Sequence, residues 1–374
     1  MTARSGWNST AFNAHHCIDD DCSYPKLHQL QDTISPFTRF SAMRNSRLAQ
    51  RPLALHIQTS FNHLCSPADS NPHSCPHRSL YLHRLQDEIR TTAQHCNKQQ
   101  PIRHLRFSAT SATQLSTQEL QELMQCLNDN FNMTSDNFSH YTIDINPSHT
   151  DWSTMGLLRA MGFNRVNIVV PDTHSSQPQL QSSLIQRSNT IEQIQHLVEA
   201  ARTLQFRTIG IDLSYGLPQQ TTAAFQRTLT EIIKLEPDRI HLHNTQRSAP
   251  EQGYSSAFSN TTYNTTIETM LYSAQQQLNQ AHYSYLGMGH FAVADDDLSY
   301  AQEDGTLQHS IDGYSTSERC DIIGLGIAAV SQLGELFYQN TTDFNAYQNT
   351  EMQLAPARGL FCATNASLYI GKAL

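Results

Sequence analysis

Apolar and polar residues alternate in two different rhythms between residue 51 and about residue 280. Short apolar runs predict strands, whereas longer stretches with an apolar residue every three or four positions predict helices. The predicted strands are Arg51–Ile57, Ile102–Phe107, Tyr141–Ile145, Arg165–Val170, Thr208–Leu213 and Arg239–His243. The predicted helices are Leu80–Gln94, Gln118–Asn130, Ser153–Met161, Thr190–Leu204, Thr222–Leu235 and Thr266–Asn279.

Six strands that alternate with six helices predict an α/β fold with a parallel sheet and helices on its outside. We expect a partial (β/α)6 TIM-like barrel, because the helices are regular in length and spacing. Local signals agree with this: Ser116 and Glu119 form a capping-box pattern, and "YGLP" (Tyr215–Pro218) is typical of a turn. In such barrels the chemistry takes place at the C-terminal ends of the strands.

The pattern divides the chain into three parts. Residues 1–50 show no sustained periodicity and are predicted to be an irregular extension, and residues 51–285 are predicted to form the barrel. Residues 286–374 are predicted to be a short, incomplete C-terminal region. This region contains a loop-like stretch, "GMGHFAVADDDLSYAQEDG", in which we expect Asp295–Asp297 to be solvated.

Composition narrows the class of protein. Charged residues make up 15% of the 374, against roughly 25% in an average globular protein. The net charge is −9, and no basic patch with interleaved aromatic residues occurs, so nucleic acid is not an expected partner. The sequence contains no run of about 18 apolar residues, which a membrane-spanning helix would require. The first residues lack an apolar signal core, so we expect a cytoplasmic protein.

The loop from His56 to His77 follows the first predicted strand and holds two of the eight cysteines, Cys65 and Cys75. Cysteine and histidine side chains both bind zinc, so His63, Cys65, His73, Cys75 and His77 are a possible metal site. The spacing of the two cysteines fits no standard zinc motif, however, and histidine is common throughout the chain. A solvated loop is the alternative interpretation.

Five segments give the chain a more specific resemblance. They are "GFNRVNI" (Gly162–Ile168), "IDLSYGLPQQT" (Ile211–Thr221), "LEPDRI" (Leu235–Ile240), "GMGHFA" with "DDDL" (Gly287–Leu298), and "GYST" with "DIIGLGIAAVS" (Gly313–Ser331). In order and spacing the chain resembles the oxygen-independent coproporphyrinogen III oxidases of the radical S-adenosylmethionine superfamily. The resemblance extends from about Pro52 to the C-terminus.

The resemblance implies a partial six-stranded barrel followed by a smaller C-terminal domain, which in the family is normally longer. It also implies a four-iron four-sulfur cluster, held by three cysteines in C-x3-C-x2-C spacing, with S-adenosylmethionine on the open iron. In that chemistry a deoxyadenosyl radical abstracts hydrogen from a propionate side chain, and decarboxylation leaves a vinyl group.

The chain departs from the family in its cluster loop. Where the family has H-I-P-F-C, the chain has His56–Ser60. Cys65 matches the second cluster cysteine, while the third position falls at Ala68 and the first near Phe61. A cubane with one open iron needs three protein ligands, and a single thiolate cannot hold it. We therefore interpret Cys65 as the sole remnant of the metal site and expect no cluster.

The cofactor-binding motifs are altered as well. The family's G-G-G-T-P after the second strand is replaced by Ser108–Ala112, whose side chains occupy space that the family leaves to bare backbone. By resemblance, Asp144 stands in place of a longer carboxylate that meets the cofactor ribose. Arg187 and Asp212 stand where the family has an arginine and an aspartate in the cofactor region. The alternative for Arg187 and Asp212 is a structural ion pair in the barrel mouth.

These observations lead to one hypothesis and two alternatives. The hypothesis is a catalytically degenerate, C-terminally shortened member of a porphyrin and heme family, with no catalytic residue and no bound cofactor, that binds a porphyrin or a nucleoside. The first alternative is an active oxidase with an atypical cluster site. The second is a ligand-free scaffold that acts through a protein partner. The cationic candidates for propionate groups are Arg165, Arg187, Arg239 and Arg247. For Asp295–Asp297, the alternative to a solvated loop is that these residues face a tetrapyrrole.

Overall fold

The structure is a computed structural model, which describes residues 30, 32–59, 77–108, 115–134, 139–170, 184–217, 220–244, 261–310, 313–316, 320–349 and 354–361. At residues 108, 184–190, 261–265, 309 and 310 it describes the backbone alone.

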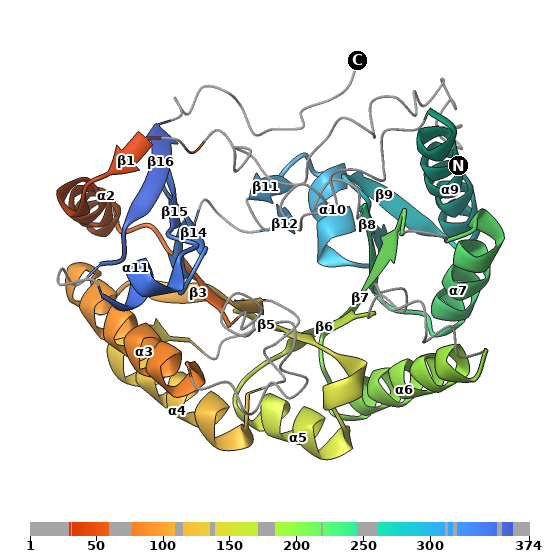
Figure 1. Cartoon of the computed structure of the whole chain (residues 1–374), viewed down its shortest axis with the longest axis horizontal. Helices are drawn as coiled ribbons and strands as arrows, with labels where there is room; N and C mark the ends of the chain where they lie inside the picture. Colours follow the sequence, from red (N-terminus) through yellow and green to blue (C-terminus); the bar gives the residue numbers. More distant parts are fainter. Residues whose placement is uncertain are drawn as a thin grey trace, which may run out of the picture.

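The six predicted strands are confirmed, and each pairs in parallel with the next. They are β2 (Leu53–Gln58), β3 (Pro101–Ser108), β5 (His140–Ile145), β6 (Arg165–Val169), β7 (Thr208–Tyr215) and β8 (Arg239–Asn244). The helices are α3 (Arg78–His95), α4 (Thr117–Asn130), α5 (Trp152–Ala160), α6 (Leu184–Thr203), α7 (Thr222–Lys234) and α9 (Thr261–Gln280). The sheet curves, and these helices cover its convex side (Figure 1). The predicted partial barrel is therefore correct.

Local sequence sets the helix starts. Ser116 caps α4 by accepting a hydrogen bond from the backbone of Glu119, whose side chain accepts in return from the backbone of Ser116. Thr221 and Asp151 cap α7 and α5 through their side-chain oxygens in the same way. In the "YGLP" turn, Gly216 has φ +78°, a left-handed conformation that glycine adopts without strain. The predicted capping box is confirmed, whereas Pro218 of the predicted turn lies outside the described residues.

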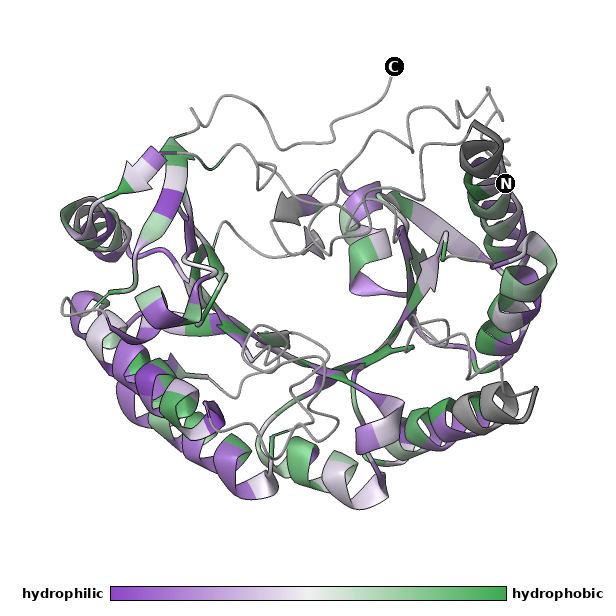
Figure 2. Ribbon diagram, in the orientation of Figure 1, coloured by the Kyte–Doolittle hydropathy of each residue, from purple (hydrophilic) through white to green (hydrophobic). Residues whose placement is uncertain are grey.

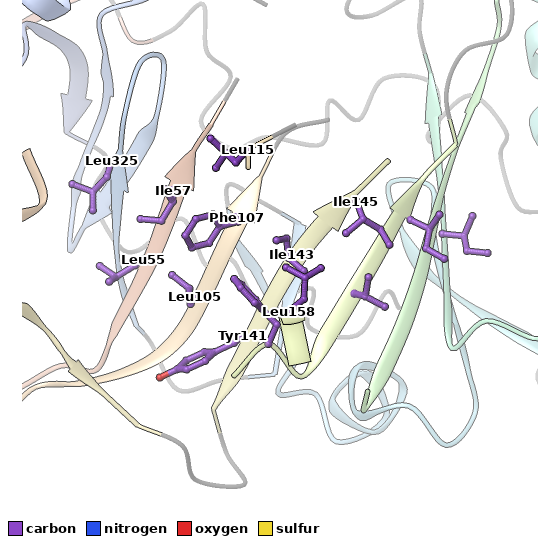
Figure 3. Close-up of a cluster of buried hydrophobic side chains, with 14 of the residues drawn as sticks. Leu55, Ile57, Leu105, Phe107, Leu115, Tyr141, Ile143, Ile145, Leu158 and Leu325 are labelled. Atoms are coloured by element: carbon purple, nitrogen blue, oxygen red, sulfur yellow. The ribbon is translucent and has the colours of Figure 1, made fainter. Parts of the chain in front are cut away.

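The core lies between the sheet and the helices. Alternate residues of the central strands point to the same side, and they include Leu55, Ile57, Leu105, Phe107, Ile143 and Ile145, each at most 1% exposed (Figure 3). Leu158 of α5 packs in the same cluster. In Figure 2 the surrounding helices carry hydrophobic stretches beside hydrophilic ones, as expected of helices with one buried face. Burial of each such side chain stabilises the fold by about 1.5–3 kcal/mol.

Strands outside the six of the barrel extend its sheet on both sides. On one side β13 (Asp321–Leu325) pairs in parallel with β2, followed by β14 (Val330–Leu333), β15 (Leu336–Asn340), β16 (Ala357–Phe361) and β1 (Asp32–Ile34) in antiparallel order. On the other side β10 (His290–Val293) pairs with β8, and β9 (Tyr283–Gly287) forms the edge. Short β4 (Asn132–Met133) pairs with β3. The division into domains at residue 285 stays a prediction.

Some segments without clear periodicity are nevertheless regular. The stretch predicted to be loop-like contains β10 and α10 (Asp297–Glu303), and the predicted irregular extension contains β1 and α2 (Pro36–Leu48). The buried positions of α2 are Arg39, Met43 and Ser46, so its inner face is largely polar and gives no hydrophobic pattern. The remaining elements are a 3-10 helix (Pro147–His149), α11 (Phe344–Gln348), and the hairpin of β11 (Gln308–Ser310) and β12 (Gly313–Ser315).

A buried polar network ties the start of the barrel to these last strands. Glu88 of α3 is 2% exposed and accepts hydrogen bonds from the backbone of Gly326, from Asn340 Nδ2 and from the Tyr347 hydroxyl, at 2.7–2.9 Å. The hydroxyl of Tyr81, also on α3, donates to the Gln58 carbonyl at the end of β2. The network thus joins segments more than 230 residues apart in sequence.

Among the described residues, no helix is both long and apolar enough to cross a membrane.

Candidate ligand site

Polar side chains from the central strands meet on the concave face of the sheet. Ile143 and Ile145 point toward the helices, so Asp144 between them lies on the opposite face. The same alternation brings one polar residue from each neighbouring strand to this face. The residues in contact are Arg106 of β3, Asp144 of β5, Asn167 of β6, Asp212 of β7 and His241 of β8. We call these five residues the carboxylate row.

The carboxylate row is continuous across five strands. Arg106 Nη2 donates to both oxygens of Asp144, at 3.2 and 3.3 Å. Asn167 Nδ2 donates to Asp144 Oδ1 at 3.3 Å and to Asp212 Oδ2 at 2.7 Å. The other oxygen of Asp212 lies 3.5 Å from His241 Nδ1. Each carboxylate therefore has a cationic or imidazole partner on its outer side and shares one amide on its inner side.

The two carboxyl groups differ in their acidity. Burial raises the pKa of Asp144 above its ordinary value, against the opposing effect of the Arg106 charge. Burial acts on Asp212 as well, but the hydrogen bond and charge of His241, with the Arg106 charge and the Asn167 hydrogen bond, outweigh it and lower the pKa to about 2. Asp212 is consequently a permanent acceptor, whereas Asp144 takes up a proton more readily.

Aromatic rings continue the row toward the β11–β12 hairpin. The His241 and His290 rings stack with centroids 3.9 Å apart and an interplanar angle of 4°. His290 in turn meets the Tyr314 ring of β12 edge-on, at 5.4 Å and 89°. The wall formed by β8 and β10 thus links Asp212 to this hairpin.

A second charged cluster lies at the opposite end of the strands. Asp297 accepts hydrogen bonds from Arg165 at 2.6 Å and from Arg239, and Asp296 accepts from Arg239 at 2.9 Å. Arg165 and Arg239 begin β6 and β8, so the cluster lies at the N-terminal ends of the strands. The expectation of a solvated Asp295–Asp297 loop is wrong for Asp296, which is 7% exposed and caps α10. Arg165 and Arg239 already have carboxylate partners, away from the barrel mouth.

The predicted site residues fall in different parts of this picture. Asp144 and Asp212 are brought together by Asn167. Arg187 lies in α6 at a position where only the backbone is described, and Cys65 and Arg247 lie outside the described residues. The cofactor-binding roles of Asp144, Arg187 and Asp212, and the metal role of Cys65, stay predictions.

Sequence reasoning missed three members of the carboxylate row, namely Arg106, Asn167 and His241. Each stands inside a predicted strand, at the same parity as the other concave-face residues. The sequence did contain a signal for these residues. Buried parallel strands are nearly continuous apolar runs, so a polar residue in the middle of one indicates a side chain with a special role.

The comparisons with known proteins agree on one family. No family model matches the chain. The chain is 41% identical over 350 residues to the oxygen-independent coproporphyrinogen III oxidase of Pseudomonas aeruginosa, which covers 91% of this chain and 75% of that protein. The chain belongs to the oxygen-independent coproporphyrinogen III oxidase family. A member of that family from Salmonella typhimurium is 30% identical over 338 residues, covering 87% of this chain and 70% of the relative.

The fold agrees with a solved member of this oxidase family. The structure of coproporphyrinogen III oxidase from Escherichia coli, a radical S-adenosylmethionine enzyme, matches with a TM-score of 0.76 and 27% identity. The match covers 93% of this chain and 80% of that structure. The family uses a four-iron four-sulfur cluster and S-adenosylmethionine.

The described thiols of this family member do not fit a cluster site. Cys96 caps the end of α3, where burial raises its pKa to about 12, and Cys126 lies within α4, where burial also raises the pKa. Cys320 immediately precedes β13, at the N-terminal end of that strand. A cluster ligand has to be a thiolate at the mouth. Within the described ranges, no group of three or more His, Cys, Asp or Glu residues could hold a metal ion.

The carboxylate row does suit a hydroxyl-bearing ligand. Asp212 is an ionised acceptor and Asp144 is held beside it, and carboxylates of this kind bind ribose hydroxyls in dinucleotide-binding folds. The register pairs Gln58 at the end of β2 with Ser108 at the end of β3. The segments that follow these two strands therefore begin at the same edge of the sheet.

Proposed function

We propose that this chain is a member of the coproporphyrinogen III oxidase family that has lost the radical chemistry and keeps the barrel as a binding site. The observation that carries the proposal is the missing ligand set. In the sequence that follows β2, residues 60–76 contain only Cys65 and Cys75, which fit no C-x3-C-x2-C spacing. The described thiols, Cys96, Cys126 and Cys320, lie away from the C-terminal strand ends. Three cysteine ligands are needed, and the resemblance to the family matches only Cys65 to one of them.

The retained ligand is, in this proposal, a nucleoside held by the carboxylate row, with a porphyrin bound more weakly. The family acts on a tetrapyrrole that carries four propionate groups, so a porphyrin site needs cations. Arg165 and Arg239 are bound by Asp296 and Asp297 at the far ends of the strands, and Arg106 is bound by Asp144. The net charge of −9 also opposes the approach of an anion.

The resemblance of Asp212 to an aspartate of the family's cofactor region favours a second candidate, an active oxidase with an atypical cluster site. Asp144 and Asp212 are joined by hydrogen bonds that a chain free of any ligand has no need to keep. Both candidates use the carboxylate row to hold the ligand and differ in whether the chain catalyses the reaction.

An anaerobic activity assay separates the two candidates. The chain, treated beforehand with iron and sulfide, is mixed with coproporphyrinogen, S-adenosylmethionine and a one-electron reductant, and carbon dioxide and deoxyadenosine are measured. We expect neither product above the level of the protein-free control. Release of both in step would establish the active oxidase instead.

A coproporphyrin titration, followed by absorbance, tests the porphyrin part of the proposal in the native chain and in Arg187→Ala. We expect weak binding that the substitution weakens further. Tight binding that is unchanged by the substitution would place the porphyrin elsewhere. Absence of both porphyrin and nucleoside binding would favour a scaffold that acts through a protein partner.

A further inference from the structure

We propose that Asn167 is a positioning residue that holds Asp144 and Asp212 together as one acceptor unit for a ligand with two neighbouring hydroxyl groups. This proposal deepens the proposed function and rests on it for the identity of the ligand, while the positioning role stands on the geometry of the row.

The first argument is that a single nitrogen atom serves both carboxylates. Asn167 Nδ2 has two hydrogens, and its contacts reach Asp144 Oδ1 at 3.3 Å and Asp212 Oδ2 at 2.7 Å. The two acids stand on strands β5 and β7, which lie on either side of β6 and do not pair with each other. Asn167 is the side chain between them, so its amide fixes the separation and direction of both groups.

The second argument is that the neighbouring strand leaves room for this amide. Gly210 of β7 stands directly opposite Asn167 in the parallel register. A Cβ built on Gly210 would lie 2.8 Å from Asn167 Oδ1, closer than such atoms approach in practice. The absence of a side chain at residue 210 therefore permits the orientation in which Nδ2 faces the two acids.

The third argument is electrostatic. Two carboxylates in a buried site repel each other, and the charge of Asp212 contributes to the raised pKa of Asp144. Arg106 and His241 act from the outer sides of the pair, whereas Asn167 supplies donors on the inner side. Without the amide, the hydrogen bond that lowers the pKa of Asp144 is lost, and the repulsion from Asp212 that raises it remains.

The ligand class follows from what the pair offers. Asp212 is an ionised acceptor with a pKa of about 2, and Asp144 beside it accepts a proton more readily. A carboxylate accepts well from a hydroxyl and repels a phosphate or a propionate. Two acceptors that share one amide suit a ligand with adjacent hydroxyl groups, as on a ribose.

The direct test is a carboxyl titration by NMR of the full chain labelled with 13C at aspartate, with Asp144→Asn and Asp212→Asn used to assign the signals. In Asn167→Ala we expect the titration midpoint of Asp144 to rise relative to the native chain. Asn167→Ser, which keeps a polar group too short to reach both acids, serves as a second variant if the alanine variant does not fold. Midpoints unchanged in the folded variant would overturn the positioning role.

The matched control is Asn164→Ala. Asn164 lies three residues before Asn167 and donates to the Ser139 carbonyl at 2.8 Å, while its Oδ1 accepts from the Tyr141 backbone at 3.0 Å, outside the row. Its loss should reduce stability and leave the Asp144 midpoint unchanged. A shift of equal size in the control would show that the effect is general loosening, which would also overturn the proposal. The double variant Asn167→Ala with Gly210→Asn, which supplies the amide from β7, should restore the midpoint at least in part.

Calorimetric titration with adenosine, 2′-deoxyadenosine and 3′-deoxyadenosine tests the ligand class. In Asn167→Ala we expect adenosine binding to weaken about tenfold or more, because hydrogen bonds to charged groups contribute that much to affinity. The variant should also lose the preference for adenosine over the two deoxyadenosines. If the native chain binds no adenosine, the proposed ligand is wrong, and the carboxyl titration alone still decides the role of Asn167. If the native chain binds all three nucleosides equally, the diol assignment is wrong.

Discussion

Replacement of Glu88 by alanine should strongly destabilise the protein. Glu88 lies on α3 and accepts three hydrogen bonds, from Gly326, Asn340 and Tyr347, all in the segment that follows β13. The side chain therefore joins the first strand–helix unit of the barrel to the strands that extend the sheet beyond it.

The magnitude follows from the contacts that are lost. Each buried hydrogen bond contributes about 1 kcal/mol, and buried donors left without an acceptor cost about 1–3 kcal/mol. Asn340 Nδ2 also donates to the Gly326 carbonyl and keeps that contact in the variant. Three lost acceptor contacts and the cavity left by the side chain give about 3–5 kcal/mol. This is a large share of the about 5–15 kcal/mol that holds a typical domain together.

The assay is urea unfolding followed by circular dichroism at pH 7. The matched control is Glu122→Ala, an exposed glutamate on α4 whose loss should change the free energy of unfolding by less than about 0.5 kcal/mol. A loss below about 1 kcal/mol for Glu88→Ala would refute the argument that this network holds the two parts of the sheet together.

The same residue gives a pH dependence with a defined sign. Burial raises the pKa of Glu88 above its ordinary value of 4.5, against the hydrogen bonds that favour the charged form. The folded state thus binds this proton more tightly than the unfolded state. The stability that Glu88 contributes is complete below pH 4.5 and is lost as the pH rises through the folded value. The disadvantage of Glu88→Gln relative to the native chain should therefore shrink as the pH rises, and growth of that difference would contradict the reasoning.

Three further substitutions test the rest of the fold. Arg239→Ala leaves the buried Asp296 without its charged partner and should cost about 3–5 kcal/mol in urea unfolding, whereas a change near zero would mean that the cluster at the N-terminal strand ends is dispensable. Gly216→Ala should cost about 1–2 kcal/mol, because φ is +78° and the new methyl group would approach Ile267 Cδ1 to 3.2 Å. Gly156→Ala on α5, with nothing within 4 Å of the new group, should instead be neutral or stabilising, and equal losses at both glycines would disprove the role of φ.

The barrel was predictable because the apolar pattern of each strand can be recognised in the local sequence. β2 and β7 are buried apolar runs between turn residues, and the helices between strands have one apolar face. Element α2 was not predictable in this way, since Arg39 and Ser46 stand on its buried face. Asp296 and Asp297 accept hydrogen bonds from Arg239, which lies 57 and 58 residues earlier in the sequence. No local pattern could have predicted these contacts.

The candidate site was predictable in part for the same reason. Asp144 and Asp212 were identified through resemblance to a family, which preserves the type of residue at a position. Asn167 was not identified, because its importance comes from its place between β5 and β7 and from the missing side chain at Gly210. Contacts across strands are a property of the register, and the register appears only in the folded structure.

The most direct test of the account is the iron content of the chain after anaerobic reconstitution with iron and sulfide. One thiolate at the three required positions cannot hold a cubane. We therefore expect no stoichiometric iron or sulfide and no thiolate-to-iron charge-transfer absorption after desalting, both in the native chain and in Cys65→Ser. About four iron atoms per native chain, lost in Cys65→Ser and accompanied by reductive cleavage of S-adenosylmethionine, would contradict it and establish a working cluster.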